Sequence, residues 1–119
     1  QRLKLTLPPG ERHMALDEMR RFVVAVKQIM DGLATKDYEM VSKAAETMGS
    51  GAANEIPDYV VAKLPETFKQ LAGKVHTTFD AISLDAADME DPEHTISQMA
   101  ALYGHCIACH AIYQVDRER

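Results

Sequence analysis

Two cysteines and a histidine near the end of the chain are the residues whose spacing most clearly indicates chemistry. Cys106 and Cys109 are the only cysteines among the 119 residues, and His110 directly follows the second one. On a helix, residues three apart lie on nearly the same side, so both sulfurs and the imidazole would face one partner. A helix over this segment would therefore present two thiols and one nitrogen ligand to a single planar group.

The spacing C-x-x-C-H is the attachment signature of c-type haem. Thioether bonds to Cys106 and Cys109 would fix the two vinyl groups of the porphyrin, and His110 would be the proximal iron ligand. The sequence thus predicts one covalently attached haem c (heme c) per chain. His105 lies five residues before His110, about 140° away around a helix, and is expected to face elsewhere.

Other uses of the cysteine pair remain open. A zinc ribbon would need further cysteine or histidine ligands at a matching spacing, and a thioredoxin-like pair would need a βαβ pattern nearby, which this sequence lacks. A simple disulfide or two packed thiols would need only the pair itself. In that case the chain would be a haem-free helical interaction module whose disulfide responds to redox conditions.

Composition limits the classes of protein that fit. A chain of 119 residues fits one domain, taken as residues 1–119. The net charge of −5 and the scattered basic residues argue against nucleic acid as a partner. No apolar run approaches the about 18 residues of a membrane-spanning helix. No carboxylate pair, nucleophile-base arrangement or phosphate-binding glycine loop stands out, so an enzyme is not expected.

Apolar residues recur at three- and four-residue spacings, and no strand is predicted. The first helix should follow the segment "LPPGERH" and end near Ala34. Thr35 should cap a second helix that ends at Gly49, and a connector then leads to Pro65 in the first turn of a third helix. Asp91, followed by proline, should start the fourth. These elements predict an all-α fold, an antiparallel four-helix bundle.

Each helix carries one apolar stripe, which is expected to face the core. The expected core residues are Leu16, Met19, Val23, Val26, Met30 and Leu33; Tyr38, Val41, Ala45 and Met48; Phe68, Ala72, Val75, Phe79, Ile82 and Ala86; and Ile96, Met99, Tyr103, Cys106, His110 and Tyr113. The cysteine-histidine motif falls on the last stripe, so the haem is expected inside the bundle near the C-terminal helix.

A four-helix chain of this length with "CIACHAIY" in its last helix resembles the class II c-type cytochromes, meaning cytochromes c′ and their low-spin, methionine-ligated relatives. The resemblance is motif-specific at Cys106, Cys109, His110 and Tyr113. It implies that a first-helix residue faces the iron on the distal side. Methionine there gives a six-coordinate iron suited to electron transfer, whereas an apolar residue leaves a five-coordinate iron that binds NO or CO. Gln114 stands where the family often carries arginine, so that arginine's role does not transfer.

Met19 is the expected distal ligand, because it lies on the core stripe about 10 Å from the start of the first helix. Met30 lies about 16 Å further along and is expected to be ordinary core. Met14 is rotated about 140° from Met19 and should point away. A shift of the stripe by one residue would make Leu16 or Phe22 the distal neighbour instead.

Three further residues are candidates for the surroundings of the haem. His76 sits one residue off its stripe, so it is expected to pack at the flank of the core, ahead of bonding a propionate or ligating iron. Arg12 and Arg20 are expected to contact the anionic propionates.

The expected function is one-electron transfer to redox partner proteins, with His110 and Met19 as axial ligands. The alternative is a five-coordinate, cytochrome c′-like protein that binds NO or CO. Covalent haem attachment takes place outside the bacterial cytoplasm, so the resemblance implies a periplasmic protein whose leader has been removed, and Gln1 in place of methionine agrees. The resemblance also implies a homodimer through exposed faces of the first two helices.

Overall fold

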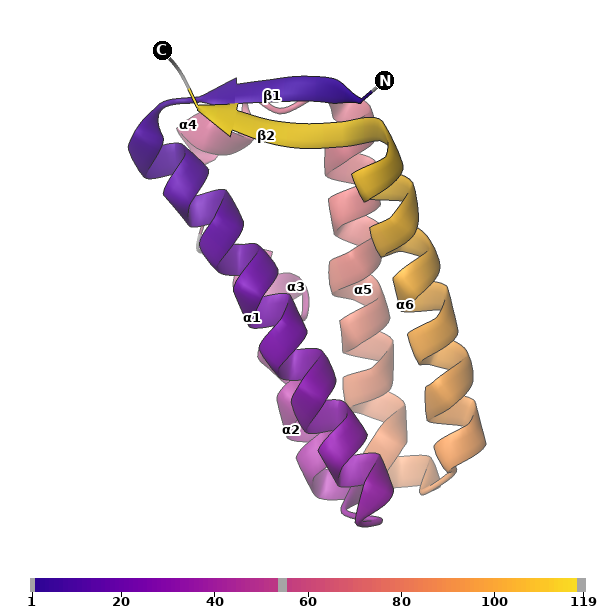
Figure 1. Ribbon diagram of the computed structural model, residues 1–119. Coiled ribbons are helices and arrows are strands. Elements are labelled where there is room, and N and C mark those ends of the chain that lie inside the picture. The colour runs from indigo at the N-terminus through magenta and orange to yellow at the C-terminus, as the bar shows by residue number, and fades with distance from the viewer. Residues whose placement is uncertain (1, 54–55, 118–119) are drawn as a thin grey trace.

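The computed structural model describes residues 2–53 and 56–117, and this part of the chain is mostly helical. Two short strands stand at its ends and were not expected from the sequence (Figure 1). In chain order the elements are β1 (Leu3–Leu7), α1 (Pro9–Ala34), α2 (Tyr38–Glu46), α3 (Ser50–Ala53), α4 (Asp58–Val61), α5 (Glu66–Met89), α6 (Pro92–Ile112) and β2 (Tyr113–Arg117). The prediction of a mainly helical chain is therefore confirmed.

The helix ends follow local capping chemistry. The side chain of Asp91 accepts hydrogen bonds from the backbone N–H groups of Glu93 and His94, so α6 begins where the sequence predicts. The predicted cap of the second helix is wrong, because Asp37 rather than Thr35 caps α2 by accepting from the Met40 N–H. The hydroxyl of Thr35 instead donates back to a carbonyl of α1, where this residue is the C-cap.

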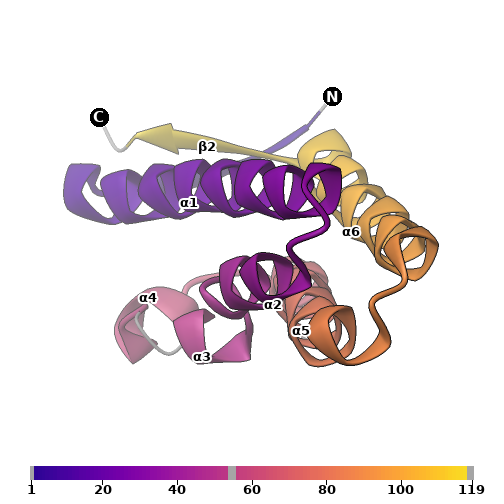
Figure 2. The same ribbon diagram turned by 90° about the horizontal axis from the view of Figure 1, so that it is seen from below.

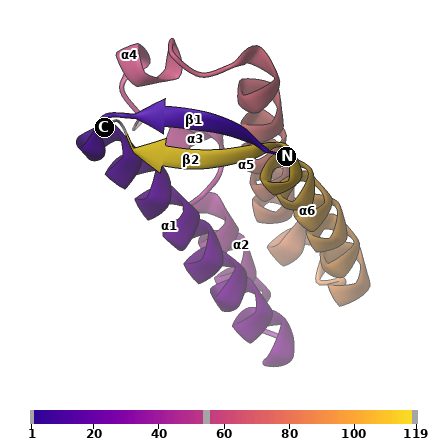
Figure 3. The same ribbon diagram turned by 45° about the horizontal axis from the view of Figure 1, so that its top comes forward.

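The core lies where three pairs of helices meet. Helix α2 packs against α1 and α5, and α5 packs against α6 (Figure 2). The largest fully buried side chains are those of Phe79, Ile29, Ile82, Leu102 and Val41. Toward its N-terminal end α1 leans away from α5 and α6, so the helices are widest apart beneath the strands (Figures 1 and 3). No helix in the described part of the chain is long and apolar enough to cross a membrane.

The predicted core stripe of α1 is confirmed only in part over its C-terminal half: Val26 and Leu33 pack against the core, but the centre of the buried side is displaced by one residue. Val23 and Met30 are 70% and 56% exposed, whereas Ala25 and Ile29 are buried. The close approach of α2 explains the shift. Gly32 faces α2, and a Cβ on it would lie 2.6 Å from Cγ2 of Val41, so only the glycine side of α1 fits against α2.

The α6 stripe is also displaced in its first half. Ile96 and Tyr103 are exposed, and Thr95 and Leu102 are buried in their place, while Met99 is buried as predicted. Apolar residues surround this helix, so spacing alone does not reveal which side meets α5. The stripes predicted for α2 and α5 are confirmed at their buried positions, which include Val41, Ala45, Met48, Val75, Phe79, Ile82 and Ala86.

Strands β1 and β2 pair in parallel, with Leu3 opposite Tyr113 and Leu5 opposite Val115. The pair spans the gap between the start of α1 and the end of α6 (Figures 1 and 3). The strand residues Leu5, Leu7 and Tyr113 are themselves buried. The strands thus tie the two ends of the described chain together and close one end of the molecule.

Candidate functional site

The cysteine-histidine motif lies in the last two turns of α6, directly before β2. Cys109 and His110 line a cavity of about 550 Å³, and Cys106 packs at the edge of the buried core. Both thiols are free and half-buried, while His110 is exposed, unlike the core position predicted for it. The motif therefore borders the cavity from its α6 side.

The cavity lies between the strand pair, the N-terminal half of α1, α4, α5 and the end of α6, all of which contribute lining residues. Its volume falls within the range of about 300–1,000 Å³ that is typical of small-molecule and cofactor sites. Most of the side chains that line it are apolar: Leu5, Leu7, Met14, Ala15, Leu16, Met19, Ile56, Val60, Val61, Leu64, Phe68, Ala72, Tyr113 and Val115. Such walls suit a large apolar ring with a few charged groups at its edge.

The α1 wall of the cavity contains the predicted distal residue. Met19 lines the cavity, and so do Leu16 and Met14, although Met14 was expected to point away. The reason is that the widened end of the molecule exposes more than one side of α1 to the same space. Phe22 is not among the lining residues, since it packs on the core with its ring stacked 5.7 Å from that of Phe79. Met30, expected in the core, is exposed.

His76 is buried within the molecule rather than placed at the flank of the core. It is 5% exposed and lines the cavity. Its Nδ1 lies 2.8 Å from the carbonyl oxygen of Met48, and its Nε2 lies 3.0 Å from Oε1 of Glu18. Burial alone would lower the pKa of His76, but the hydrogen bonds to Glu18 and Met48 and the Glu18 charge outweigh it and raise the pKa. Each ring nitrogen therefore faces an acceptor, which suits the doubly protonated imidazolium.

Burial raises the pKa of the Cys106 thiol, and burial together with the negative charge of a Cys106 thiolate raises the pKa of Cys109. Both shifts favour the neutral thiols. In the described ranges no group of three or more histidine, cysteine or acidic side chains lies close enough to hold a metal ion. The motif thus lacks the clustered, deprotonated ligands that a structural zinc site uses.

The charged residues at the cavity differ from those expected. Arg12 and Arg20 are not among the lining residues, whereas Arg2 and Lys69 are. A guanidinium nitrogen of Arg2 lies 3.5 Å from the backbone carbonyl oxygen of His110, which places this cation beside the motif. The cations of the cavity therefore come from the chain start and from α5. The order of residues along the chain gave no signal for Arg2, because β1 was not predicted.

Tyr113 lines the cavity as its position in the motif suggests. The residue is buried, and its ring meets that of Phe68 edge to face with centroids 5.4 Å apart. Gln114, which stands where class II c-type cytochromes often carry arginine, also lines the cavity. The end of α6 and the first residues of β2 thus form one continuous wall.

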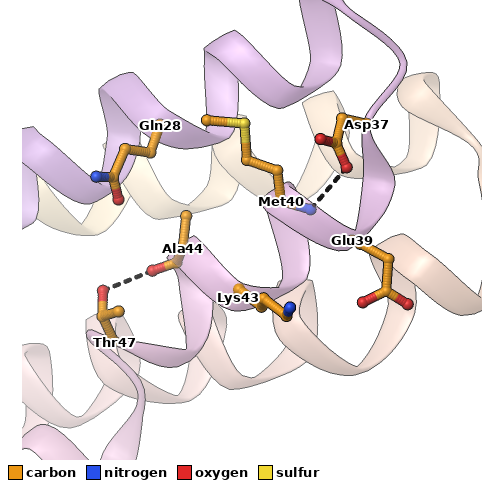
Figure 4. Close-up of a pocket in the computed structure, with 7 residues that line it drawn as sticks. All are labelled: Gln28, Asp37, Glu39, Met40, Lys43, Ala44 and Thr47. Atoms are coloured by element: carbon orange, nitrogen blue, oxygen red, sulfur yellow. Dashed lines mark hydrogen bonds between the residues drawn. The ribbon is translucent and has the colours of Figure 1, made fainter.

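A second cavity, of about 420 Å³, lies where α2 meets α1. Figure 4 shows its lining residues, among which Asp37 caps α2 and Thr47 donates to the carbonyl of Ala44. None of its lining residues belongs to the motif or to the first cavity. It brings together no pair of groups with evident chemistry.

No protein-family model, curated protein or solved structure matches this chain. The motif and the cavity that it borders are therefore the features of this chain that point to a function.

Proposed function

We propose that this chain is a c-type cytochrome that resembles the class II group and transfers one electron at a time. In this proposal Cys106 and Cys109 bind the haem through thioether bonds, His110 is the proximal ligand of the iron, and Met19 is the distal ligand. One observation carries the proposal. Cys109 and His110 from α6 and Met19 from α1 line the same apolar cavity.

The residues around the cavity fit a haem. The apolar walls would accept the porphyrin face, and Arg2 and Lys69 offer cations for the propionates. Cys106 lies one helical turn before His110 and packs at the core edge, so it borders the site without lining the cavity. Neither Arg12 nor Arg20 lines the cavity. Their predicted contacts with the propionates stay predictions.

The bound haem would supply a one-electron redox centre, and the chain would set its properties. Apolar side chains exclude water, and methionine sulfur raises the reduction potential relative to a second histidine. Tyr113 and Phe68 would form part of the wall against the ring. In the same proposal α1, α2, α5 and α6 form the four-helix bundle of a single domain over residues 1–119, and the protein works in the periplasm with redox partner proteins. A homodimer through the first two helices belongs to the same resemblance.

A five-coordinate protein that binds NO or CO is the second candidate. It is favoured by Leu16, an apolar side chain without a ligand atom that lines the same cavity as Met19. If Leu16 rather than Met19 faced the iron, the distal position would stay open to small gases.

Visible spectra of the oxidised, reduced and CO-treated protein distinguish these functions. We expect a low-spin spectrum and little CO binding for the natural sequence, and a high-spin spectrum with ready CO binding for Met19→Ala. The matched control is Met30→Ala, because Met30 lies on the same helix but is exposed to solvent. A natural protein that is high-spin and binds CO freely would instead support the gas-binding function. A colourless protein would support the haem-free module.

A further inference from the structure

Three elements meet at His76 beside the cavity. The residue lies on α5, Glu18 contacts its Nε2 from α1, and the Met48 carbonyl contacts its Nδ1 from just beyond α2. Glu18 directly precedes Met19 in the sequence, and both line the cavity with His76. We propose that the Glu18–His76 pair is a positioning device that holds α1 where Met19 reaches the haem iron, an inference that rests on the proposed function.

The contacts hold α1 on both sides of Met19. Glu18 lies 3.0 Å from the His76 ring nitrogen, and Phe22, one turn further along, lies 5.4 Å from the His76 ring between centroids. Residues four apart stack on one side of a helix, so Glu18 and Phe22 form a single edge of α1 against α5. Met19 is rotated about 100° from Glu18, which directs it to a neighbouring side of the helix.

The pair lies where packing alone defines α1 least. Toward its N-terminus α1 leans away from α5 and α6 (Figure 1), and both Glu18 and His76 line the cavity between these helices. A hydrogen-bonded contact between charged groups has a narrow range of favourable lengths, unlike apolar contact across a wide gap. It therefore fixes the distance between α1 and α5 at the level of Met19.

The same contacts also select methionine over histidine as the ligand. With Nδ1 at the Met48 carbonyl and Nε2 at Glu18, neither nitrogen of His76 has a lone pair to offer to iron. Loss of Glu18 would free Nε2 within the cavity. The pair thus keeps Met19 close to the iron position and keeps both ring nitrogens of His76 in hydrogen bonds.

Substitutions at Glu18 test the proposal in the haem-loaded protein. Glu18→Ala should bind CO about tenfold more readily than the natural protein, because losing a hydrogen bond to a charged group changes an equilibrium constant by about tenfold or more. Alternatively, Glu18→Ala should lose the methionine-to-iron charge-transfer band altogether. Glu18→Gln keeps an oxygen that accepts from His76 and should retain most of the band. Asp17→Ala is the matched control, since it removes a neighbouring carboxylate that forms an ion pair with Arg21 within α1.

The outcomes separate this proposal from the proposed function. A natural protein with the methionine band and a Glu18→Ala protein that keeps the same band and CO binding would overturn the positioning role alone. Absence of the band in the natural protein would overturn methionine ligation and the positioning role with it. If Glu18→Ala does not yield haem-loaded protein, Glu18→Leu, which keeps bulk but cannot accept a hydrogen bond, carries the same expectation and the same refutation.

Discussion

Gly32 of α1 lies directly against Val41 of α2, with no room for a side chain between them. A Cβ at position 32 would lie 2.6 Å from Cγ2 of Val41 and 2.9 Å from the Asp37 carbonyl oxygen. This contact sets how close the two helices come. It also determines which side of α1 is buried, and thereby which residues of its N-terminal half reach the cavity.

Replacing Gly32 with alanine should lower the free energy of unfolding by about 1–3 kcal/mol, the usual cost of overpacking a core. Gly104→Ala is the control, because nothing lies within 4 Å of a Cβ at that helical position. That change should raise stability by about 0.5–1 kcal/mol, since alanine is the better helix former. Denaturant unfolding measures both. Equal stability of the two variants would mean that α1 and α2 do not meet at Gly32.

Stability should fall as the pH rises above 6.5, the ordinary histidine pKa, because the pKa of His76 is raised in the folded protein. The ordinary value is 6.5, so the stabilising charge on His76 is fully present below that pH and is lost as the pH rises through the folded-state pKa. Glu18→Gln removes the negative partner and should flatten this dependence. Denaturant unfolding between pH 5 and about pH 9 measures it. Parallel pH profiles for the two proteins would contradict a Glu18–His76 ion pair.

Lys63 neutralises a carboxylate that is nearly buried at the edge of the cavity. Its Nζ lies 2.8 and 3.0 Å from the two carboxylate oxygens of Glu11. Lys63→Met leaves that carboxylate without its cation and should cost about 1–3 kcal/mol of unfolding free energy. Adding Glu11→Gln should recover part of the loss.

Lys74→Met, at an exposed position of α5, is the control and should change stability by less than about 0.5 kcal/mol. Should both lysine variants behave alike, the segment after α4 is not tied to α1 through Glu11.

Local chemistry made much of the fold predictable. Asp91 before a proline identifies the start of α6, and Pro65 directly precedes α5, because capping and proline geometry act within a few residues. The buried side of α5 was also predictable, since the apolar residues of this helix gather on one side. The segment Leu3–Leu7 carries the alternation of a strand, Leu-Lys-Leu-Thr-Leu, but its parallel partner lies more than a hundred residues away.

The meeting of the candidate residues at one cavity was predictable in part, but the shape of the cavity was not. Cys109 and His110, singled out by their spacing, and Met19, singled out by helical geometry with the family resemblance, line the same cavity. The inclusion of Met14 and the burial of His76 depend on how far α1 leans from α5. That angle results from contacts such as Gly32 with Val41, which join helices and leave no periodic signal in the sequence.

Intact mass under denaturing conditions tests the central claim most directly. Protein produced together with a c-type haem attachment system should carry the mass of one haem that unfolding does not release, and the Cys106→Ala/Cys109→Ala variant should have the mass of the polypeptide alone. An Ile107→Ala variant, altered between the two cysteines at an exposed position, should keep the haem. A natural chain that leaves the same system with only its polypeptide mass would contradict the account.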